Sequence, residues 1–353
     1  MKKLLYIGHS FHNKTNSTKF LLDLFTTKYE VTKFDYDPYN DTFEKLKELS
    51  GKSYDVVVLF QIMPSISLLK KIISYKHIAF FPMYDDTRNL NNSLWYEYRE
   101  CNIINFSKTL HKKCMDYGFS SYYIQYFPEP MEVKDWGDES SIFFWQRINK
   151  INPNVIKKII NPMKVSKFYL HNVPDPKNKM YYPSKEWDGK VEYSTWFESR
   201  QELLAYIQKA AIYIAPREYE GFGNSYLDAM ACGRCVIALN NPAMNEYITH
   251  GKNGFLYSLD KLEELNLKDI RKIQQNTINY VKKGREHWIN KKSNILHWIT
   301  NEVVVNEIVL RDKYYPKQKF FERIFSIKND SDKRHKIITV LGFRIKIKRG
   351  KNV

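Results

Sequence analysis

The sequence is notable first for what it lacks: it has only four cysteines and no long apolar run. Cys232 and Cys235 form a CxxC pair, but Cys101 and Cys114 add no zinc-like spacing, so we interpret the pair as small core residues beside Gly233. No apolar run approaches the roughly 18 residues needed to cross a bilayer. The opening residues, MKKLLYIGHS, become polar too soon for a signal peptide, and we expect a cytoplasmic protein.

Two kinds of nucleotide-binding motif are also missing. The segment after the first expected strand, GHSFHNKTNS, has one glycine, which disfavours a dinucleotide cofactor such as NAD. There is no zinc-finger, RRM or helix-turn-helix signature. The formal charge of +17 still requires an anionic partner, which is a nucleotide, an acidic membrane surface or nucleic acid. We expect no nucleic acid; RNA binding is the alternative, and it predicts a steep salt dependence of affinity.

What the chain does have is length and apolar residues for two cores. It contains 353 residues, of which 43% are hydrophobic and 15% aromatic, and this favours two domains. Strand and helix patterns alternate through the first half, which predicts a parallel, doubly wound sheet. The strands expected there are Lys3–Gly8, Val31–Tyr36, Asp55–Phe60, His77–Phe81, Cys101–Phe106 and Tyr122–Tyr126. Ser107 is expected to cap the helix over 108–117.

The most informative stretch is 216–255, PREYEGFGNSYLDAMACGRCVIALNNPAMNEYITHGKNGF. The apolar run before it predicts a buried strand, and Gly221 and Gly223 predict a loop that a ligand approaches closely. A helix is expected over 225–232, ending at Gly233. In an open α/β sheet, such a helix start offers N–H groups to an anion, while Glu220 and Asp228 offer carboxylates to hydroxyl pairs. The stretch therefore suits a phosphate with a sugar or ribose.

Glu220 with the GFG after it, Asp228 followed by AMACG, Glu246 and the GKNGF turn resemble the donor-binding signature of the retaining GT-B glycosyltransferases of family 4. The resemblance implies a GT-B fold, α/β, in which two Rossmann-like doubly wound parallel-sheet domains face a central cleft. It implies that Glu220 contacts the transferred sugar. It also implies that Asp228, at a position where the family usually has Glu, holds the nucleotide ribose. It further implies donor contacts from Gly221, Phe222, Gly223, Asn224 and Ser225.

The resemblance also assigns cations to the leaving diphosphate. Arg147 matches the family's arginine after the strand expected over 141–145, and Lys150 follows it sooner than the family's lysine does. Two solvated loop cations are the alternative. With these cations, neither a metal nor another cofactor is required, and the nucleotide-sugar is a substrate. Trp196 and Phe197 lie where relatives present the nucleotide base, so we expect Trp196 to contact the donor; core packing is the alternative.

Acceptor-side residues are expected on strand-end loops of the first domain. Asp85, Asp86 and Arg88 follow one strand and His9 follows another. The two aspartates are hypothesised to orient the acceptor hydroxyl, with a turn or helix cap as the alternative. His9 is a weaker candidate, because a solvated loop histidine is more common.

The domain boundaries follow from these patterns. We expect a Rossmann-like acceptor-side domain over 1–130, a Rossmann-like donor domain over 131–300, and a crossing segment with a basic tail over 301–353. Helices are expected over 259–283 and 287–300, the second returning to the first domain. Lys336–Arg349, KIITVLGFRIKIKR, predicts a hairpin around Leu341 and Gly342 with one apolar and one cationic face. We hypothesise that this tail rests on an anionic membrane surface, at the inner face of the cytoplasmic membrane; packing on protein is the alternative.

Together these features predict a retaining glycosyltransferase. It would move a sugar from a UDP-, GDP- or ADP-sugar to a hydroxyl of a glycan or lipid-linked oligosaccharide, in synthesis of a bacterial surface polysaccharide such as lipopolysaccharide, O-antigen or capsule. A nucleotide-sugar epimerase of the same fold and a non-catalytic sugar-nucleotide or polysaccharide-binding scaffold are the alternatives.

Overall fold

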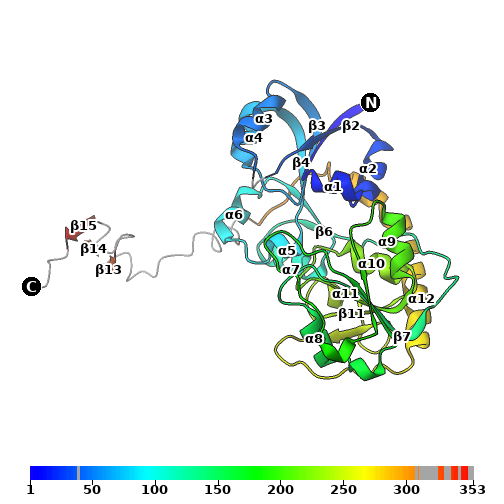
Figure 1. Cartoon of the computed structure of the whole chain (residues 1–353). Coiled ribbons are helices and arrows are strands. Elements are labelled where there is room, and N and C mark those ends of the chain that lie inside the picture. Colours follow the sequence, from blue (N-terminus) through cyan, green and yellow to red (C-terminus); the bar gives the residue numbers. More distant parts are fainter. Residues whose placement is uncertain (38–39, 307–308, 310–324, 330–334, 341–342, 349–353) are drawn as a thin grey trace, which may run out of the picture. The chain divides into compact units, whose positions relative to one another are not determined.

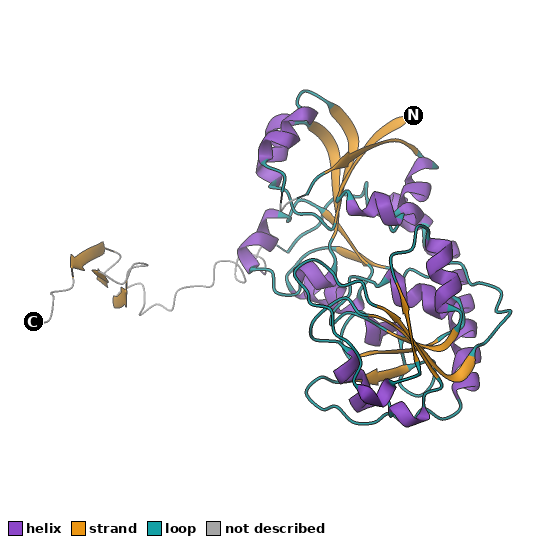
Figure 2. Cartoon of the chain, viewed as in Figure 1, coloured by secondary structure: helices purple, strands orange, loops and turns teal. Residues whose placement is uncertain are grey.

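The computed structural model describes residues 1–37, 40–306, 309, 325–329, 335–340 and 343–348. These residues belong to a main unit, Met1–Val304, and a tail unit, Val305–Val353. The main unit contains two six-stranded sheets, each flanked by helices (Figures 1 and 2).

The first sheet is parallel throughout and has the order β2-β1-β3-β4-β5-β6. Its strands are β1 (Lys2–Gly8), β2 (Tyr29–Asp35), β3 (Ser53–Phe60), β4 (Ser74–Phe81), β5 (Asn102–Asn105) and β6 (Ser121–Tyr123). The helices between them are α1 (Phe11–Thr15), α2 (Lys19–Thr26), α3 (Phe43–Leu46) with the 3-10 turn η1 (Lys47–Leu49), α4 (Ile66–Ile72), α5 (Tyr84–Thr87), α6 (Asn92–Glu97) and α7 (Lys108–Asp116). We call Met1–Tyr123 the first lobe.

The second sheet is also parallel and has the order β12-β11-β10-β7-β8-β9. Its strands are β7 (Asp138–Trp145), β8 (Lys167–His171), β9 (Val191–Ser194), β10 (Ala210–Ile214), β11 (Cys235–Leu239) and β12 (Phe255–Tyr257). The helices and 3-10 turns that follow these strands are α8 (Pro153–Ile159), η2 (Pro162–Lys164), η3 (Lys185–Trp187), α9 (Arg200–Ile207), α10 (Asn224–Ala231), α11 (Met244–Tyr247) and α12 (Ile270–Lys291). We call Asp138–Lys291 the second lobe.

The strand orders confirm the predicted doubly wound α/β architecture and also locate the ligand sites. The direction of winding reverses between β1 and β3 in the first sheet and between β7 and β10 in the second. Ligands of open α/β sheets bind beyond the carboxyl ends of the strands at such a reversal. The loops after β7 and β10 are therefore the place to look for a site in the second lobe.

A cluster of five aromatic rings joins the two lobes. We call it the aromatic junction; it consists of Phe20, Phe106, Tyr126, Phe222 and Trp288. The rings of Phe20 and Tyr126 stack 3.9 Å apart, and those of Phe106 and Phe222 lie 5.1 Å apart. Aromatic pairs at such distances add to the stabilisation that burial alone gives. The junction therefore fixes the loop after β10 against the first lobe.

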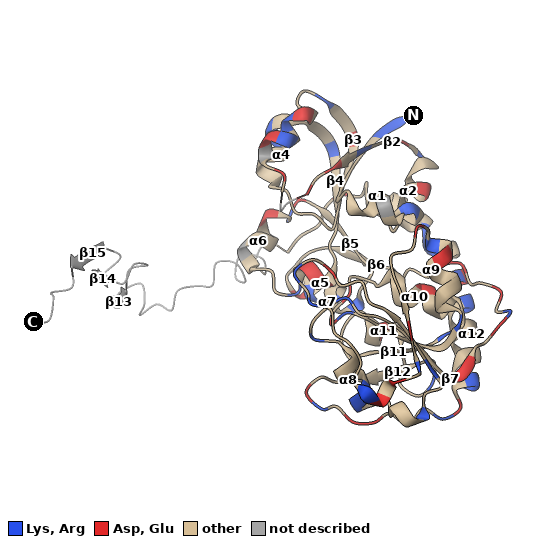
Figure 3. Ribbon diagram, in the orientation of Figure 1, with Lys and Arg blue, Asp and Glu red and all other residues tan. Residues whose placement is uncertain are grey.

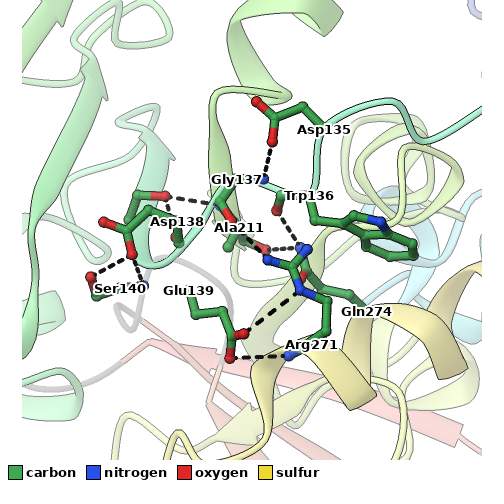
Figure 4. Close-up of polar contacts among 10 residues, drawn as sticks. Asp135, Trp136, Gly137, Asp138, Glu139, Ser140, Ala211, Arg271 and Gln274 are labelled. Atoms are coloured by element: carbon green, nitrogen blue, oxygen red, sulfur yellow. Dashed lines mark hydrogen bonds and ion pairs between the residues drawn. The ribbon is translucent and has the colours of Figure 1, made fainter.

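Helix α12 holds the beginning of β7 in place (Figure 4). The Gln274 amide donates to the carbonyls of Trp136 and Ala211 at 2.8 and 3.2 Å. Arg271 donates to the Gly137 carbonyl at 3.1 Å and pairs with Glu139 at 3.6 Å. Because these bonds satisfy backbone groups next to the strand, they anchor the entrance to the second lobe.

The helix expected over 259–283 is present from Ile270 onward, but its predicted start was wrong. The chain from Leu259 to Asp269 runs outside any helix, and α12 begins only at Ile270 and continues unbroken to Lys291. Leucines at 259, 262 and 265 have a helical spacing, but they pack on the core from a non-helical segment, and the Leu265 N–H bonds to the Ile159 carbonyl. Gly284 lies inside α12 without interrupting it, and the Phe127 ring occupies the space where a Cβ would lie.

The chain then returns to the first lobe, as expected. Helix α13 (Ser293–Trp298) packs on α2 and β5, and the Trp298 indole donates to the Ile103 carbonyl at 3.1 Å.

Among the helices in the described ranges, none is long and apolar enough to span a membrane.

The tail unit is a three-stranded antiparallel sheet of β13 (Phe325–Asn329), β14 (His335–Val340) and β15 (Phe343–Lys348). The pairing of β14 with β15 confirms the predicted hairpin, whereas β13 was not predicted. The turn residues Leu341 and Gly342, and Arg349, lie outside the described residues.

Candidate active site

The candidate site lies at the reversal point of the second sheet. Strand β7 ends at Trp145 and leads to Arg147, while the neighbouring strand β10 ends at Ile214 and leads to Glu220. Adjacent parallel strands end at the same edge of a sheet, so two loops about 70 residues apart in sequence meet there.

One carboxylate at this edge binds two arginines. Asp175, in the loop after β8, accepts a hydrogen bond from the Arg147 Nε at 2.9 Å, and the same oxygen forms an ion pair with Nη2 at 2.8 Å. Its other oxygen accepts from the Arg217 Nη2 at 2.9 Å. The Arg147 guanidinium also lies over the Trp145 ring, 4.7 Å from the centroid. We call Arg147, Asp175 and Arg217 the arginine pair cluster.

Glu220 lies beside this cluster and is buried, with 8% of its surface exposed. Burial raises the pKa of the Glu220 carboxyl, while Arg217 and Arg147 oppose that rise and Asp175 adds to it. Burial alone would lower the pKa of Arg217, but Glu220, Asp175 and other nearby carboxylates raise it. A buried carboxyl with a perturbed pKa and adjacent cations is typical of a functional site.

Lys150 takes no part in the arginine pair cluster. Its ammonium lies 2.7 Å from the Glu218 carboxylate, and 65% of its side chain is exposed. This pairing raises the pKa of Lys150.

The glycines before α10 bring backbone close to other groups. Gly223 has φ = 76°, and a Cβ there would lie 1.9 Å from the Tyr226 ring. A Cβ on Gly221 would lie 2.8 Å from the Met83 sulfur, so the loop after β10 touches the end of β4. Asn224 and Ser225 form the first turn of α10, and the Asn224 amide donates to the Ser17 carbonyl of the first lobe at 3.3 Å. Phe222 is a buried member of the aromatic junction.

Asp228 is paired rather than free. It lies on α10 and accepts from Arg200 of α9 through both carboxylate oxygens. Burial raises the pKa of Asp228, while Arg200 opposes that rise. Trp196, between β9 and α9, is 60% exposed, whereas the Phe197 ring stacks on His171 with centroids 4.8 Å apart. Of the two aromatic residues, Trp196 is thus the more exposed.

The first lobe presents acidic groups to the same place. Helix α5 follows β4 and carries Asp85 and Asp86 in its first turn (Figure 3). Burial, then Asp86 and Glu220, raise the pKa of Asp85 to about 7. One oxygen of Asp85, Oδ1, is buried without a hydrogen-bond partner. Because Met83 is the N-cap of α5 and lies against Gly221, the loop that carries Glu220 reaches the start of this helix.

A hydrogen-bonded chain leads from Asp86 to the reversal point of the first sheet. Asp86 accepts from the Gln61 amide, Gln61 Oε1 lies 2.9 Å from His12 Nε2, and His12 Nδ1 lies 2.7 Å from the Ser17 hydroxyl. Gln61 adopts the left-handed conformation, with φ = 65°. These groups follow β1, β3 and β4, so the polar chain joins the strand-end loops on this side.

The other two acceptor-side candidates have different surroundings. The Arg88 guanidinium lies 4.2 Å from the centroid of the Tyr219 ring, so it spans the two lobes near Glu220. His9 lies 3.5 Å from Asp37 and accepts from the Phe11 N–H at 3.0 Å. The structure thus brings Asp85, Asp86 and Arg88 to the loop after β10, while His9 faces the end of β2.

Sequence reasoning missed Asp175, Arg217 and Arg200. Asp175 follows a parallel strand at its carboxyl end, which is a signal that could have found it. Arg217 stands three residues before Glu220 in the most informative stretch. Arg200 carried no signal, because only the folded chain brings α9 beside α10.

The comparisons with known proteins agree with this geometry. Residues 149–274 match the family model described as glycosyl transferases group 1. Among solved structures, sucrose-phosphate synthase from Thermosynechococcus elongatus superposes with a TM-score of 0.58 at 12% identity, covering 84% of this chain and 100% of that one. Anabaena HepE, in a complex with UDP and glucose, gives 0.57 at 12% identity, covering 84% and 98%. A glycosyltransferase from Rickettsia africae gives 0.55 at 12% identity, covering 84% and 97%. A search of curated proteins gives no match.

These likenesses establish the fold. The chain has the GT-B architecture of two parallel α/β lobes, and the match to the group 1 family model covers the part of the second lobe that contains Lys150, Glu220 and Asp228.

Proposed function

We propose that this protein is a retaining glycosyltransferase that transfers a sugar from a nucleoside-diphosphate donor to a carbohydrate hydroxyl. The observation that carries the proposal is the meeting of the arginine pair cluster, buried Glu220 and the start of α10 at the reversal point of the second sheet. Cations and N–H groups stabilise a diphosphate where its charge develops, and this needs no reorganisation during the reaction.

In this proposal each group has one role. Arg147 faces the leaving diphosphate, Glu220 contacts the transferred sugar and Asp228 faces the ribose. The bond from the anomeric carbon to the phosphate oxygen breaks as a bond to the acceptor oxygen forms, and the acceptor proton passes to the departing diphosphate. Retention of the anomeric configuration is supported by the family resemblance of Glu220, the GFG turn and Asp228.

Other assignments belong to the same proposal. Gly221 to Ser225 and the exposed Trp196 ring contact the donor, and Asp85, Asp86 and Arg88 face the acceptor. Lys150 joins the diphosphate only by leaving Glu218, from which it now lies 2.7 Å away. No metal or other cofactor is part of this proposal, because side-chain cations and helix N–H groups supply the positive charge.

The proposal also includes a biological setting for the enzyme. We propose a cytoplasmic enzyme of bacterial surface-polysaccharide synthesis that acts on a glycan or lipid-linked acceptor. The basic tail, with nine Lys or Arg and two Asp in residues 328–353, supports contact with an anionic membrane.

Transfer assays test the proposal directly. The protein is incubated with UDP-, GDP- and ADP-sugars, with and without glycan acceptors; nucleoside diphosphate release is measured and the product anomer is assigned by NMR. We expect release that depends on the acceptor, and a loss of about 100-fold or more in rate for Glu220→Gln and for Arg147→Met. Lys164→Met, which removes an exposed cation paired with Glu264, is the control and retains activity.

Three outcomes would overturn the proposal. Undiminished rates in both Glu220→Gln and Arg147→Met would remove these residues from the reaction. Conversion of the donor with no acceptor present would identify an epimerase. Tight binding of a sugar nucleotide without turnover in any combination would identify a binding scaffold.

A further inference from the structure

Arg217 lies beside the cation that the proposed function places on the diphosphate. Both guanidinium groups bind one carboxylate: Asp175 Oδ1 accepts from Arg147 Nε at 2.9 Å and lies 2.8 Å from its Nη2, and Oδ2 accepts from Arg217 at 2.9 Å. A carboxylate bridging two arginines in this way holds their planar groups close together, and Arg presents five N–H donors in all. Most donors of Arg217 are therefore left for another acceptor.

We propose that Arg217 is the second cation that binds the donor diphosphate, alongside Arg147, and that it takes this role in place of Lys150. The inference rests on the proposed function, and it assigns to Arg217 a substrate contact that neither the sequence motif nor the family match gives it.

The hydrogen bonding of Arg217 differs from that of a structural arginine in the same lobe. Arg234 is fully buried, and its Nε, Nη1 and Nη2 all donate to backbone carbonyls, of Cys232, Gln208, Ala210 and Asp135. In Arg217, by contrast, Nε is buried without a partner among the described residues, and the hydrogen bond found there is the one from Nη2 to Asp175. A buried donor without a partner is costly, so a ligand that supplies an acceptor there binds more tightly.

The position of Arg217 also favours this residue over Lys150 as the second cation that binds the diphosphate. Arg217 is half-buried and lies among Asp175, Glu220 and the first-lobe carboxyls Asp85 and Asp86, whose charges raise its pKa. Lys150 extends into solvent toward Glu218. An ammonium in solvent is strongly hydrated, whereas a half-buried guanidinium matches phosphate oxygens with two parallel N–H groups.

The test measures how strongly the protein distinguishes a nucleoside diphosphate from its monophosphate. Calorimetric titration identifies which of UDP, GDP and ADP binds the wild type most tightly, and the affinity for that diphosphate is divided by the affinity for its monophosphate. We expect Arg217→Met to reduce this ratio about 10- to 100-fold, as the loss of a charge-assisted hydrogen bond does. Arg217→Lys should retain part of the ratio, Lys150→Met should reduce it less than Arg217→Met does, and Lys164→Met should leave it unchanged.

The ratio of diphosphate affinity to monophosphate affinity distinguishes the loss of a diphosphate contact from misfolding. A variant that is only misfolded loses affinity for both nucleotides, so its ratio stays near that of the wild type. A ratio unchanged in Arg217→Met, or a larger loss in Lys150→Met, would overturn the assignment while the proposed function stands. Failure of the wild type to bind any of the three diphosphates would overturn the proposed function and this inference with it.

Discussion

At the scale of single residues, the site is defined by two carboxyl groups that come from different lobes. Glu220 is buried after β10, and Asp85 is partly buried on α5 with its Oδ1 atom unpartnered. Burial is the main cause that raises the pKa of each, and the charge of Glu220 further raises that of Asp85. Because burial and the neighbouring carboxylates raise the pKa of Asp85 to about 7, the site carries a proton that depends on pH.

The protonation of Asp85 makes the free energy of unfolding depend on pH. The pKa of an unperturbed aspartate is 3.8, and the folded protein raises that of Asp85 to about 7. Between these values the folded state keeps a proton that the unfolded state has lost, so the free energy of unfolding falls as pH rises through this window. Asp85→Asn cannot lose a proton. We expect this variant to be more stable than the wild type by about 1–3 kcal/mol at pH 8 and close to it at pH 4.

Urea unfolding of both proteins at pH 4, 6 and 8 measures this difference. Asp116→Asn, an exposed aspartate at the end of α7, is the matched control and should give the same small difference at every pH. If the stability gained by Asp85→Asn does not grow with pH, the raised pKa of Asp85 is contradicted.

At the scale of elements, one glutamate ties a helix of the first lobe to the second lobe. Glu246 lies on α11, and its Oε1 accepts from the Ser107 hydroxyl and the Thr109 N–H, both at 2.9 Å. Its Oε2 accepts from the Lys108 N–H at 2.6 Å. These groups form the N-terminus of α7, where Ser107 is the N-cap that the sequence predicted and accepts from the Leu110 N–H. A carboxylate suits this place, because free N–H groups and the helix dipole both favour negative charge.

Glu246→Gln should therefore weaken the contact between α11 and α7. The amide keeps the size of the side chain but loses its charge and directs an NH2 group at a backbone N–H. We expect the free energy of unfolding to fall by about 2 kcal/mol, measured by urea unfolding at pH 7. The matched control is Glu44→Gln, an exposed first-turn glutamate of α3 that pairs with Lys47, for which little change is expected. Equal losses of unfolding free energy in the two variants would show that the three hydrogen bonds of Glu246 do not stabilise the contact between α11 and α7.

At the scale of the whole molecule, the sequence predicted the sheets well, because buried parallel strands have an unmistakable pattern. The runs VVVLF of β3 and AIYI of β10 are apolar at every position, and each is followed by loop residues and a helix. The helix expected at Leu259 starts only at Ile270, because leucines spaced by three residues also occur in a non-helical segment that packs on a core. Only tertiary contacts, such as that of Leu265 with Ile159, distinguish the two cases.

The polar part of the site was less predictable for a related reason. Glu220 and Arg147 stand in motifs, and their neighbourhood could be inferred from strand order alone. The partners of Arg147 and Asp228 could not, because Asp175 and Arg200 come from other loops and helices whose distances depend on the packed fold. The prediction of Lys150 beside the diphosphate remains a prediction, since its ammonium is bound to Glu218.

The tail unit offers the last test, which concerns the whole chain. Apolar and basic residues alternate along β15. The register places Ile345 opposite Ile338 and Arg344 opposite Thr339, whereas Lys336 pairs with Ile347 and Ile337 with Lys346. Alternate positions share a face of a sheet, so the alternation along β15 favours the proposed amphipathic surface, and each basic residue near an anionic membrane contributes roughly 1 kcal/mol. A chain ending at Asn306 should therefore bind vesicles of phosphatidylglycerol and phosphatidylcholine at least about 10-fold more weakly than the full chain at low salt, as measured by co-sedimentation.

The same truncated chain should keep the urea midpoint and nucleoside-diphosphate affinity of the full chain, because the main unit, Met1–Val304, is compact without the tail. The control that separates charge from length is the full chain with Lys336, Arg344, Lys346 and Lys348 replaced by Gln. If this variant binds vesicles as weakly as the truncated chain, charge carries the interaction, and raising the salt concentration should weaken the wild type in the same way. Undiminished vesicle binding by the truncated chain would instead place any membrane contact on the main unit, and the basic tail would then require another partner.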